Sequence, residues 1–145
     1  MHVADLATGD ARLLPPPDGI IGRFALGGPL AQFVNIGADG DRALLLDIDP
    51  ASATFHQIVA TVPLSKLSNG PQAGQPTTGR EARAGAVTPD GRWSFVAHGG
   101  DGAISVIDTQ AKRVTATIDT PTPMRGGGYL FAVQPGMRIA DLMTR

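Results

Sequence analysis

The sequence contains no cysteine among its 145 residues. This absence excludes disulfides, thiolate metal sites and a cysteine nucleophile. Long apolar runs are also lacking, since residues 43–46 and 129–133 are far shorter than the ~20 residues that cross a bilayer as a helix. The sequence therefore predicts no membrane span. No export signal is visible either, because Asp5, Asp10 and Arg12 interrupt the first twenty residues.

Neither sign of charge is in excess, with 12 Lys and Arg against 13 Asp and Glu and a net charge of -1. A protein that binds nucleic acid through its phosphates needs a basic face, so we expect no nucleic-acid partner. Glycine (19) and proline (12) are abundant, yet 42% of the residues are hydrophobic. This composition favours a folded core interrupted by many turns.

The alternation of apolar and polar residues predicts short strands over residues 83–87, 93–97, 103–107 and 113–118. Pro89-Asp90-Gly91-Arg92 has the composition of a tight turn, and the remaining connections are rich in Gly, Asp and Thr. Four strands within so short a stretch leave no room for helices. The sequence predicts an all-β chain whose clearest unit is a four-stranded antiparallel meander.

The same unit occurs earlier in the chain. Residues 33–40 parallel residues 95–102 at an offset of 62, Ile48-Asp49 parallels Ile107-Asp108 at 59, and residues 59–62 parallel 115–118 at 56. Shorter portions of the unit are found at residues 3–14 and 129–142. A repeated unit of four strands per roughly 40 to 45 residues is typical of propeller blades.

The closest match lies at Val87-Thr88-Pro89-Asp90-Gly91-Arg92, followed by Phe95-Val96-Ala97-His98 and Ile104-Ser105-Val106-Ile107-Asp108-Thr109. Here the chain resembles the YVTN-type β-propeller repeat, a WD40-like architecture. The resemblance implies a bacterial protein that works outside the cytoplasm, periplasmic or secreted. It also suggests related propellers that carry haem in cytochrome-type nitrite reductases or that form subunits of amine dehydrogenases.

The repeat divides the chain into a half blade (1–14), a blade (19–64), a long interblade loop (65–82), a second blade (83–120) and a final half blade (126–145). This amounts to about three blade equivalents, whereas propellers close with roughly four to eight blades. We therefore expect an incomplete ring, which a homo-oligomer completes or of which this chain is a fragment. Trp93, Phe95, Val96, Ile104, Val106 and Ile107 are expected to be largely buried.

Candidate binding residues lie on the loops that a propeller presents at one end: His98, Asp101, Arg80 and Arg125. A loop imidazole can bind a metal or haem iron, but the three histidines of the chain are widely separated. Asp5, Asp49 and Asp108 recur at one place in the repeat, so we expect them to accept hydrogen bonds from turn amides. The same turn chemistry accounts for Asp39, Asp41 and Asp47, and no calcium loop is expected.

No catalytic motif, metal site or cofactor site is found in the sequence. We therefore expect a non-enzymatic module that binds a protein or a small ligand through its loop face, without a cofactor. One alternative is a haem-binding or redox-enzyme-associated propeller, which only His98 supports. The other is a fragment of a longer propeller protein.

Overall fold

The computed structural model describes residues 2–5, 7–14, 19–37, 39–65, 83–98, 101–122, 130–133 and 135–136. Within these ranges the chain is all-β and antiparallel, which confirms the expected fold class at this level. No helix of the described part is long and apolar enough to cross a membrane. No closed ring of sheets is formed by the described residues.

The strands form one hairpin and two four-stranded meanders. The hairpin pairs β1 (His2–Ala4) with β2 (Ala11–Leu13). The first sheet has the order β3 (Ile20–Gly27), β4 (Leu30–Gly37), β5 (Gly40–Asp47), β6 (Ile58–Leu64). The second sheet has the order β7 (Gly85–Val87), β8 (Trp93–His98), β9 (Ala103–Asp108), β10 (Arg113–Asp119). The meander expected near residues 83–118 is thus present.

The turn at Pro89–Arg92 forms as its sequence predicts. Asp90 Oδ1 accepts a hydrogen bond from the Arg92 amide at 2.9 Å, and Gly91 adopts a φ of 72°, which favours glycine. A Cβ on Gly91 would lie 2.7 Å from Pro29 Cδ. This turn therefore packs tightly against the turn between β3 and β4.

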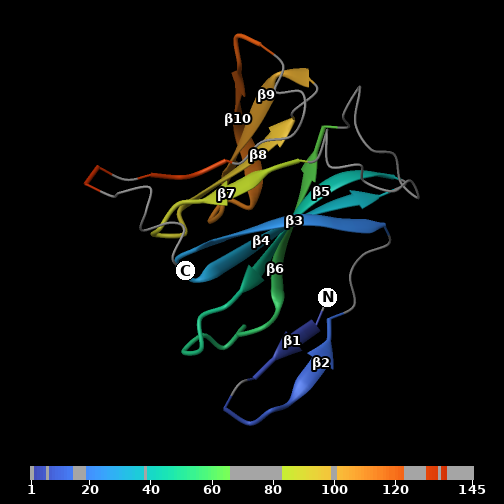
Figure 1. Cartoon of the computed structure of the whole chain (residues 1–145), viewed down its shortest axis with the longest axis vertical. Helices are drawn as coiled ribbons and strands as arrows, with labels where there is room; N and C mark the ends of the chain where they lie inside the picture. Colours follow the sequence, from blue (N-terminus) through green and yellow to red (C-terminus); the bar gives the residue numbers. More distant parts are fainter. Residues whose placement is uncertain are drawn as a thin grey trace.

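The two sheets pack face to face, with β7 on β3 and β4 and with β10 on β6 (Figure 1). Both sheets contribute to one apolar core, whose buried members are Val34, Ala43, Leu45, Ala60, Val62, Leu64, Val96 and Ile107. The sheets approach closely at Gly27, where an added Cβ would lie 2.4 Å from the backbone oxygen of Thr88 and 2.7 Å from Val87 Cβ. Glycine at this position lets β7 lie directly on the end of β3.

The hairpin covers part of the opposite face of the first sheet. Leu14 and Val3 from the hairpin region pack with Ala31, Leu46, Phe33, Ile48 and Ile58. Arg12 Nη2 donates a hydrogen bond to the backbone oxygen of His56 at 2.9 Å. The first sheet is therefore the middle of three layers, between the hairpin and the second sheet (Figure 1).

The expected burial of the second sheet is correct for one face only. Val96 and Ile107 are fully buried, whereas Trp93, Phe95, Ile104 and Val106 are half-buried. Strand side chains alternate between faces, and these four point away from the first sheet. We call this the outer face of the second sheet; it carries Trp93, Phe95, Ala97, Ile104, Val106, Asp108, Ala116 and Ile118.

A bulge at the same place in both sheets aligns the repeat. Pairing shifts between Leu45 and Leu46 in the first sheet and opposite Val106 and Ile107 in the second. Leu45 therefore corresponds to Val106, an offset of 61, and Ala60 corresponds to Ala116, an offset of 56. Their partners on the neighbouring strands, Gln32 and Phe95, correspond at an offset of 63.

The structural repeat corrects the sequence alignment by one residue on β4 and by two on β5. The offset of 56 expected for the last strand is right, but 62 and 59 become 63 and 61. A slip of one residue exchanges the two faces of a strand. With the corrected offset, the inward-facing Gln32 and Val34 correspond to Phe95 and Ala97 of the outer face. Each sheet thus turns the same side toward the next layer.

The two terminal units are only partly described. Residues 2–4 and 11–13 form the hairpin expected near the N-terminus. In the C-terminal unit a strand was expected over 129–133, but Leu130–Val133 lies in no strand, and residue 129 is outside the described residues. Pro135 and Gly136 form a turn, as expected. Residues 137–142 and most of the interblade loop 65–82 lie outside the described residues.

Candidate functional site: a buried polar cluster beneath the loops

A polar cluster lies between the two sheets, at the ends of the strands that lead into the expected loop face. Its members are Asp41, Ser65, Arg83, His98 and Ser105, which we call the Arg83 cluster. Asp41 is the second residue of β5, just after the β4–β5 turn. Ser65 and Arg83 lie at the two ends of the interblade loop. His98 is the last residue of β8, before the β8–β9 loop. The cluster therefore joins the bases of three loops.

Arg83 is the centre of the cluster, and its side chain is fully buried. Its Nη2 donates a hydrogen bond to Asp41 Oδ2 at 2.5 Å and another to the backbone oxygen of Ser65, while Nη1 donates to His98 Nδ1 at 2.9 Å. Burial lowers the pKa of Arg83, and the charge of Asp41 opposes this effect. A buried guanidinium needs such a partner, because an unpaired charge in the interior is costly.

These contacts fix the protonation of His98. Arginine can only donate hydrogen bonds, so Nδ1 must accept from Arg83, and the proton of the neutral ring is on Nε2. Nε2 then donates to Ser105 Oγ at 2.6 Å. Burial, reinforced by the charge of Arg83, lowers the pKa of His98 to about 4, against the opposing charges of Asp101 and Asp41. His98 is therefore neutral near pH 7.

The pair formed by His98 and Ser105 lacks the geometry of a catalytic dyad. A general base must accept the hydroxyl proton on a free ring nitrogen. Here the nitrogen that faces Ser105 carries the proton, and the other nitrogen accepts from a cation instead of donating to a carboxylate. Both side chains are also buried, with Ser105 4% and His98 2% exposed. The pair joins β8 to β9 within the second sheet, and His98 is not placed to activate Ser105 as a nucleophile.

The four candidate binding residues differ in placement. His98 was expected on a loop, but the structure places it at the end of β8 beneath the loops, where both ring nitrogens have partners. Asp101 is exposed in the β8–β9 loop and acts electrostatically on Arg83 and His98. Arg80 and Arg125 lie outside the described residues. The structure thus brings together His98 and Asp101 from this set.

The repeated aspartates serve the turns, as expected. Asp5 Oδ1 accepts from the Ala7 amide at 2.8 Å, Asp49 Oδ1 from the Ala51 amide at 2.9 Å, and Asp108 Oδ1 from the Ala111 amide at 2.7 Å. Asp47, at the end of β5, accepts from Ser52 Oγ and Thr54 Oγ1, both at 2.5 Å, and these bonds lower its pKa. Asp47, not Asp49, corresponds to Asp108 in the structural repeat.

Asp108 additionally forms an ion pair with Arg92, at 2.6 and 2.8 Å from its two oxygens. The hydrogen bonds from Arg92 lower the pKa of Asp108 to about 2. The Arg92 guanidinium also lies 4.3 Å from the centre of the Trp93 ring. Unlike the Arg83 pair, this pair is partly exposed, with 31% of the Arg92 side chain accessible.

Sequence reasoning missed the buried polar contacts between the sheets. Asp41 was expected in a turn, but its carboxylate pairs with Arg83, which the sequence showed only as the start of a strand. Ser94 Oγ donates to Gln32 Oε1, and Gln32 Nε2 donates to the backbone oxygen of Phe95 at 3.4 Å. A polar residue within an apolar strand is the only signal in the sequence. It does not identify the partner.

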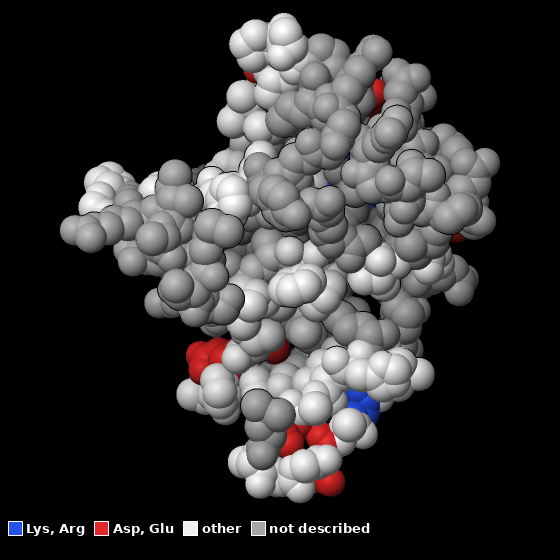
Figure 2. Space-filling model, in the orientation of Figure 1, with Lys and Arg blue, Asp and Glu red and all other residues white. Residues whose placement is uncertain are grey.

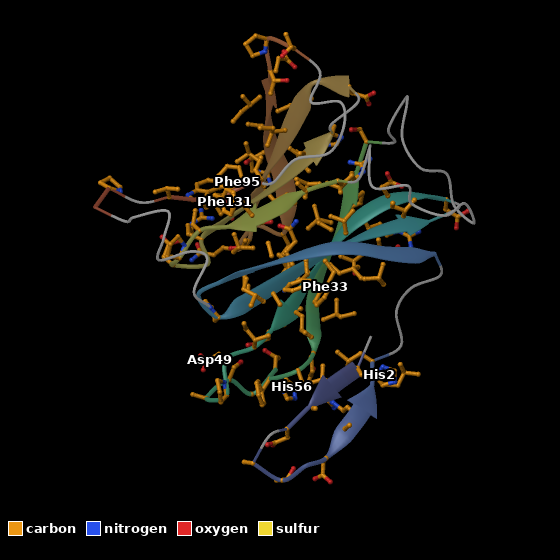
Figure 3. The ribbon with its side chains drawn as sticks, in the orientation of Figure 1. His2, Phe33, Asp49, His56, Phe95 and Phe131 are labelled. Atoms are coloured by element: carbon orange, nitrogen blue, oxygen red, sulfur yellow. The ribbon has the colours of Figure 1, made fainter. Side chains whose placement is uncertain are left out.

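The described residues form no group of three or more His, Cys, Asp or Glu side chains that could hold a metal ion. Figure 3 places His2 and His56 near the hairpin, together with Asp49. His98 is distant from these residues in the sequence and is the last residue of β8 in the second sheet. On the face drawn in Figure 2, described Lys and Arg side chains are few, and the acidic ones gather toward the hairpin end.

Comparison with known proteins gives no family assignment. No protein-family model matches the chain, and no curated protein matches it.

Proposed function

We propose that this chain is a non-enzymatic repeat module of β-propeller blades that binds a protein or a small ligand through its loop face. The observation that carries the proposal is the Arg83 cluster, which ties the bases of three loops to two packed meanders. Binding residues are commonly found on loops that a rigid scaffold positions. The common bulge and the shared side of each sheet support the assignment of the meanders to a repeat.

Within this proposal the ligand contacts come from the exposed loop residues, and His98 has a supporting role. Asp101 is exposed in the β8–β9 loop and acts electrostatically on Arg83 and His98 of the cluster. Arg80 and Arg125 belong to the neighbouring loops in the sequence. The geometry of His98 argues against the haem alternative, because an axial ligand needs a free ring nitrogen. An absorbance scan of the purified protein tests that alternative, since bound haem gives a Soret band.

The proposal is tested with a random-peptide phage library panned against the purified chain. Peptides enriched on the chain are expected to lose binding to Asp101→Ala, Arg80→Ala or Arg125→Ala. They are expected to keep it with Gln110→Ala, which changes an exposed turn residue at the opposite end of β9. Enriched peptides that bind all variants equally would contradict a loop-face site.

A further inference from the structure

Two large apolar side chains on β3 are exposed on the face of the first sheet that carries the hairpin. Phe24 is 63% and Leu26 is 59% exposed. Pairing with Phe33 and Ala31 places them on the same face as those residues, which pack with the hairpin. The hairpin thus covers one part of this face and leaves the β3 part open. We call Phe24 and Leu26 the β3 strip.

The second sheet shows what normally covers these positions. Leu26 corresponds to Val87 and Phe24 to Gly85, both at an offset of 61. Val87 is only 5% exposed, because β3 and β4 lie over it and Gly27 lets β3 come close. The exposure of Leu26 therefore marks a place where two strands equivalent to β3 and β4 fit. A complete four-stranded sheet does not fit, because the hairpin already occupies the outer half.

One segment of the chain has the sequence of the end of an inner strand and of the turn that follows it. Ala132-Val133-Gln134-Pro135 parallels Ala86-Val87-Thr88-Pro89, the end of β7 and its turn. Leu130–Val133 lies in no strand among the described residues, and Phe131 and Val133 are each 51% exposed. The segment and the β3 strip thus both expose large apolar side chains.

We propose that a second copy of this chain covers the β3 strip with the segment that contains Leu130–Val133, and that the contact is reciprocal. The two copies then form a closed dimer in which each hairpin lies beside this segment of its partner, an isologous arrangement. The proposal rests on the assignment of the meanders to a propeller repeat. Ala132 parallels Ala86, and Ala86 corresponds to Ala25 at the offset of 61. Ala25 pairs with the inward-facing Gln32, so it lies on the face of β3 that is turned toward the second sheet.

Light scattering coupled to size exclusion tests the proposal over micromolar to submillimolar concentrations. The wild-type chain is expected to have the mass of a dimer. The double variant Phe24→Asp/Leu26→Asp is expected to be a monomer with an unchanged far-UV circular dichroism spectrum, since both side chains are largely exposed. A wild-type monomer throughout the range, as expected if a longer polypeptide covers the strip, would overturn the proposal.

Thr61→Asp is the matched control, because it introduces an aspartate on the same face of the same sheet. Thr61 corresponds to Thr117, which stays exposed although a complete sheet lies beside it. The control is therefore expected to remain dimeric. Loss of the dimer in Thr61→Asp, or its retention in the double variant, contradicts the proposed contact.

Complementation gives a second test. Ala132→Asp alters the covering segment and is expected to be monomeric by itself. Mixed with the double variant, it retains one intact contact of the two, so a heterodimer is expected to form at high concentration. A mixture that stays monomeric overturns the reciprocal contact. Peptide binding at the loop face is independent of these results, so failure of the dimer is distinguishable from failure of the proposed function.

Discussion

Replacing Arg83 by methionine removes the cation from the centre of the interface between the sheets. The Arg83 side chain is fully buried, and Asp41, 2.5 Å away, is 5% exposed. Methionine fills much of the space but leaves the Asp41 carboxylate buried and unpaired. Breaking a buried pair in this way costs about 3–5 kcal/mol. Because a domain is stable by only about 5–15 kcal/mol, we expect a large fall in the urea midpoint.

The assay is urea unfolding followed by far-UV circular dichroism for Arg83→Met, Asp41→Asn and the double variant. The double variant is expected to be more stable than Arg83→Met, because it leaves no unpaired carboxylate. Arg92→Met is the control, since its ion pair with Asp108 is partly exposed and a much smaller loss is expected. A loss below about 1 kcal/mol for Arg83→Met, or strictly additive effects, would refute the reasoning.

Three further predictions concern titration, the core and a turn. Between pH 6.5 and about 4 the unfolded chain binds a proton at His98 that the folded chain does not, so the free energy of unfolding falls as the pH falls through this window; His98→Gln is expected to flatten that slope in urea titrations. Ile107→Ala is expected to cost about 2–5 kcal/mol by the same assay, and Phe95→Ala less, because only Ile107 is fully buried. Gly91→Ala is expected to cost more than about 1 kcal/mol in thermal unfolding, because its φ is 72° and a Cβ would meet Pro29.

The local parts of the fold were predictable from the sequence because they depend on neighbouring residues. The turn at Pro89–Arg92 follows from a proline, an Asx-type aspartate and a glycine that tolerates positive φ. The strands around it follow from alternation over four to eight residues. These signals predicted the antiparallel meander and the turn roles of Asp5, Asp49 and Asp108.

The register of the repeat was not predictable, because both faces of the strands are apolar. On β5, Ala43, Leu44, Leu45 and Leu46 are all buried although they alternate between faces. Shifting such a strand by one residue leaves the hydrophobic pattern unchanged, so the alignment followed the similarity of Phe33 and Phe95. The bulge between Leu45 and Leu46 fixes the register, and backbone pairing is needed to see it.

The Arg83 cluster was missed for a different reason. Its contacts join residues separated by up to 42 positions, as between Arg83 and Asp41. The sequence contains 13 acidic residues, and nothing local distinguishes Asp41 from the aspartates that serve turns. His98 was assigned to a loop because glycines follow it. Its side chain is in fact only 2% exposed, and the local sequence pattern could not predict this burial.

The two sheets differ in how far the side chains on their two faces are buried. The first sheet, which has a neighbour on each side, buries consecutive residues of β5, whereas the second sheet leaves Ile104 and Val106 half-buried on its outer face. The equivalents of these two residues in the first sheet, Ala43 and Leu45, are 0% and 1% exposed. Antiparallel sheets with one solvated face show polar residues there, whereas the outer face of the second sheet is mainly apolar and carries Asp108 at the end of β9. The partial exposure of Ile104 and Val106 therefore follows from their place on the outer face, whereas Ala43 and Leu45 lie between two packed sheets.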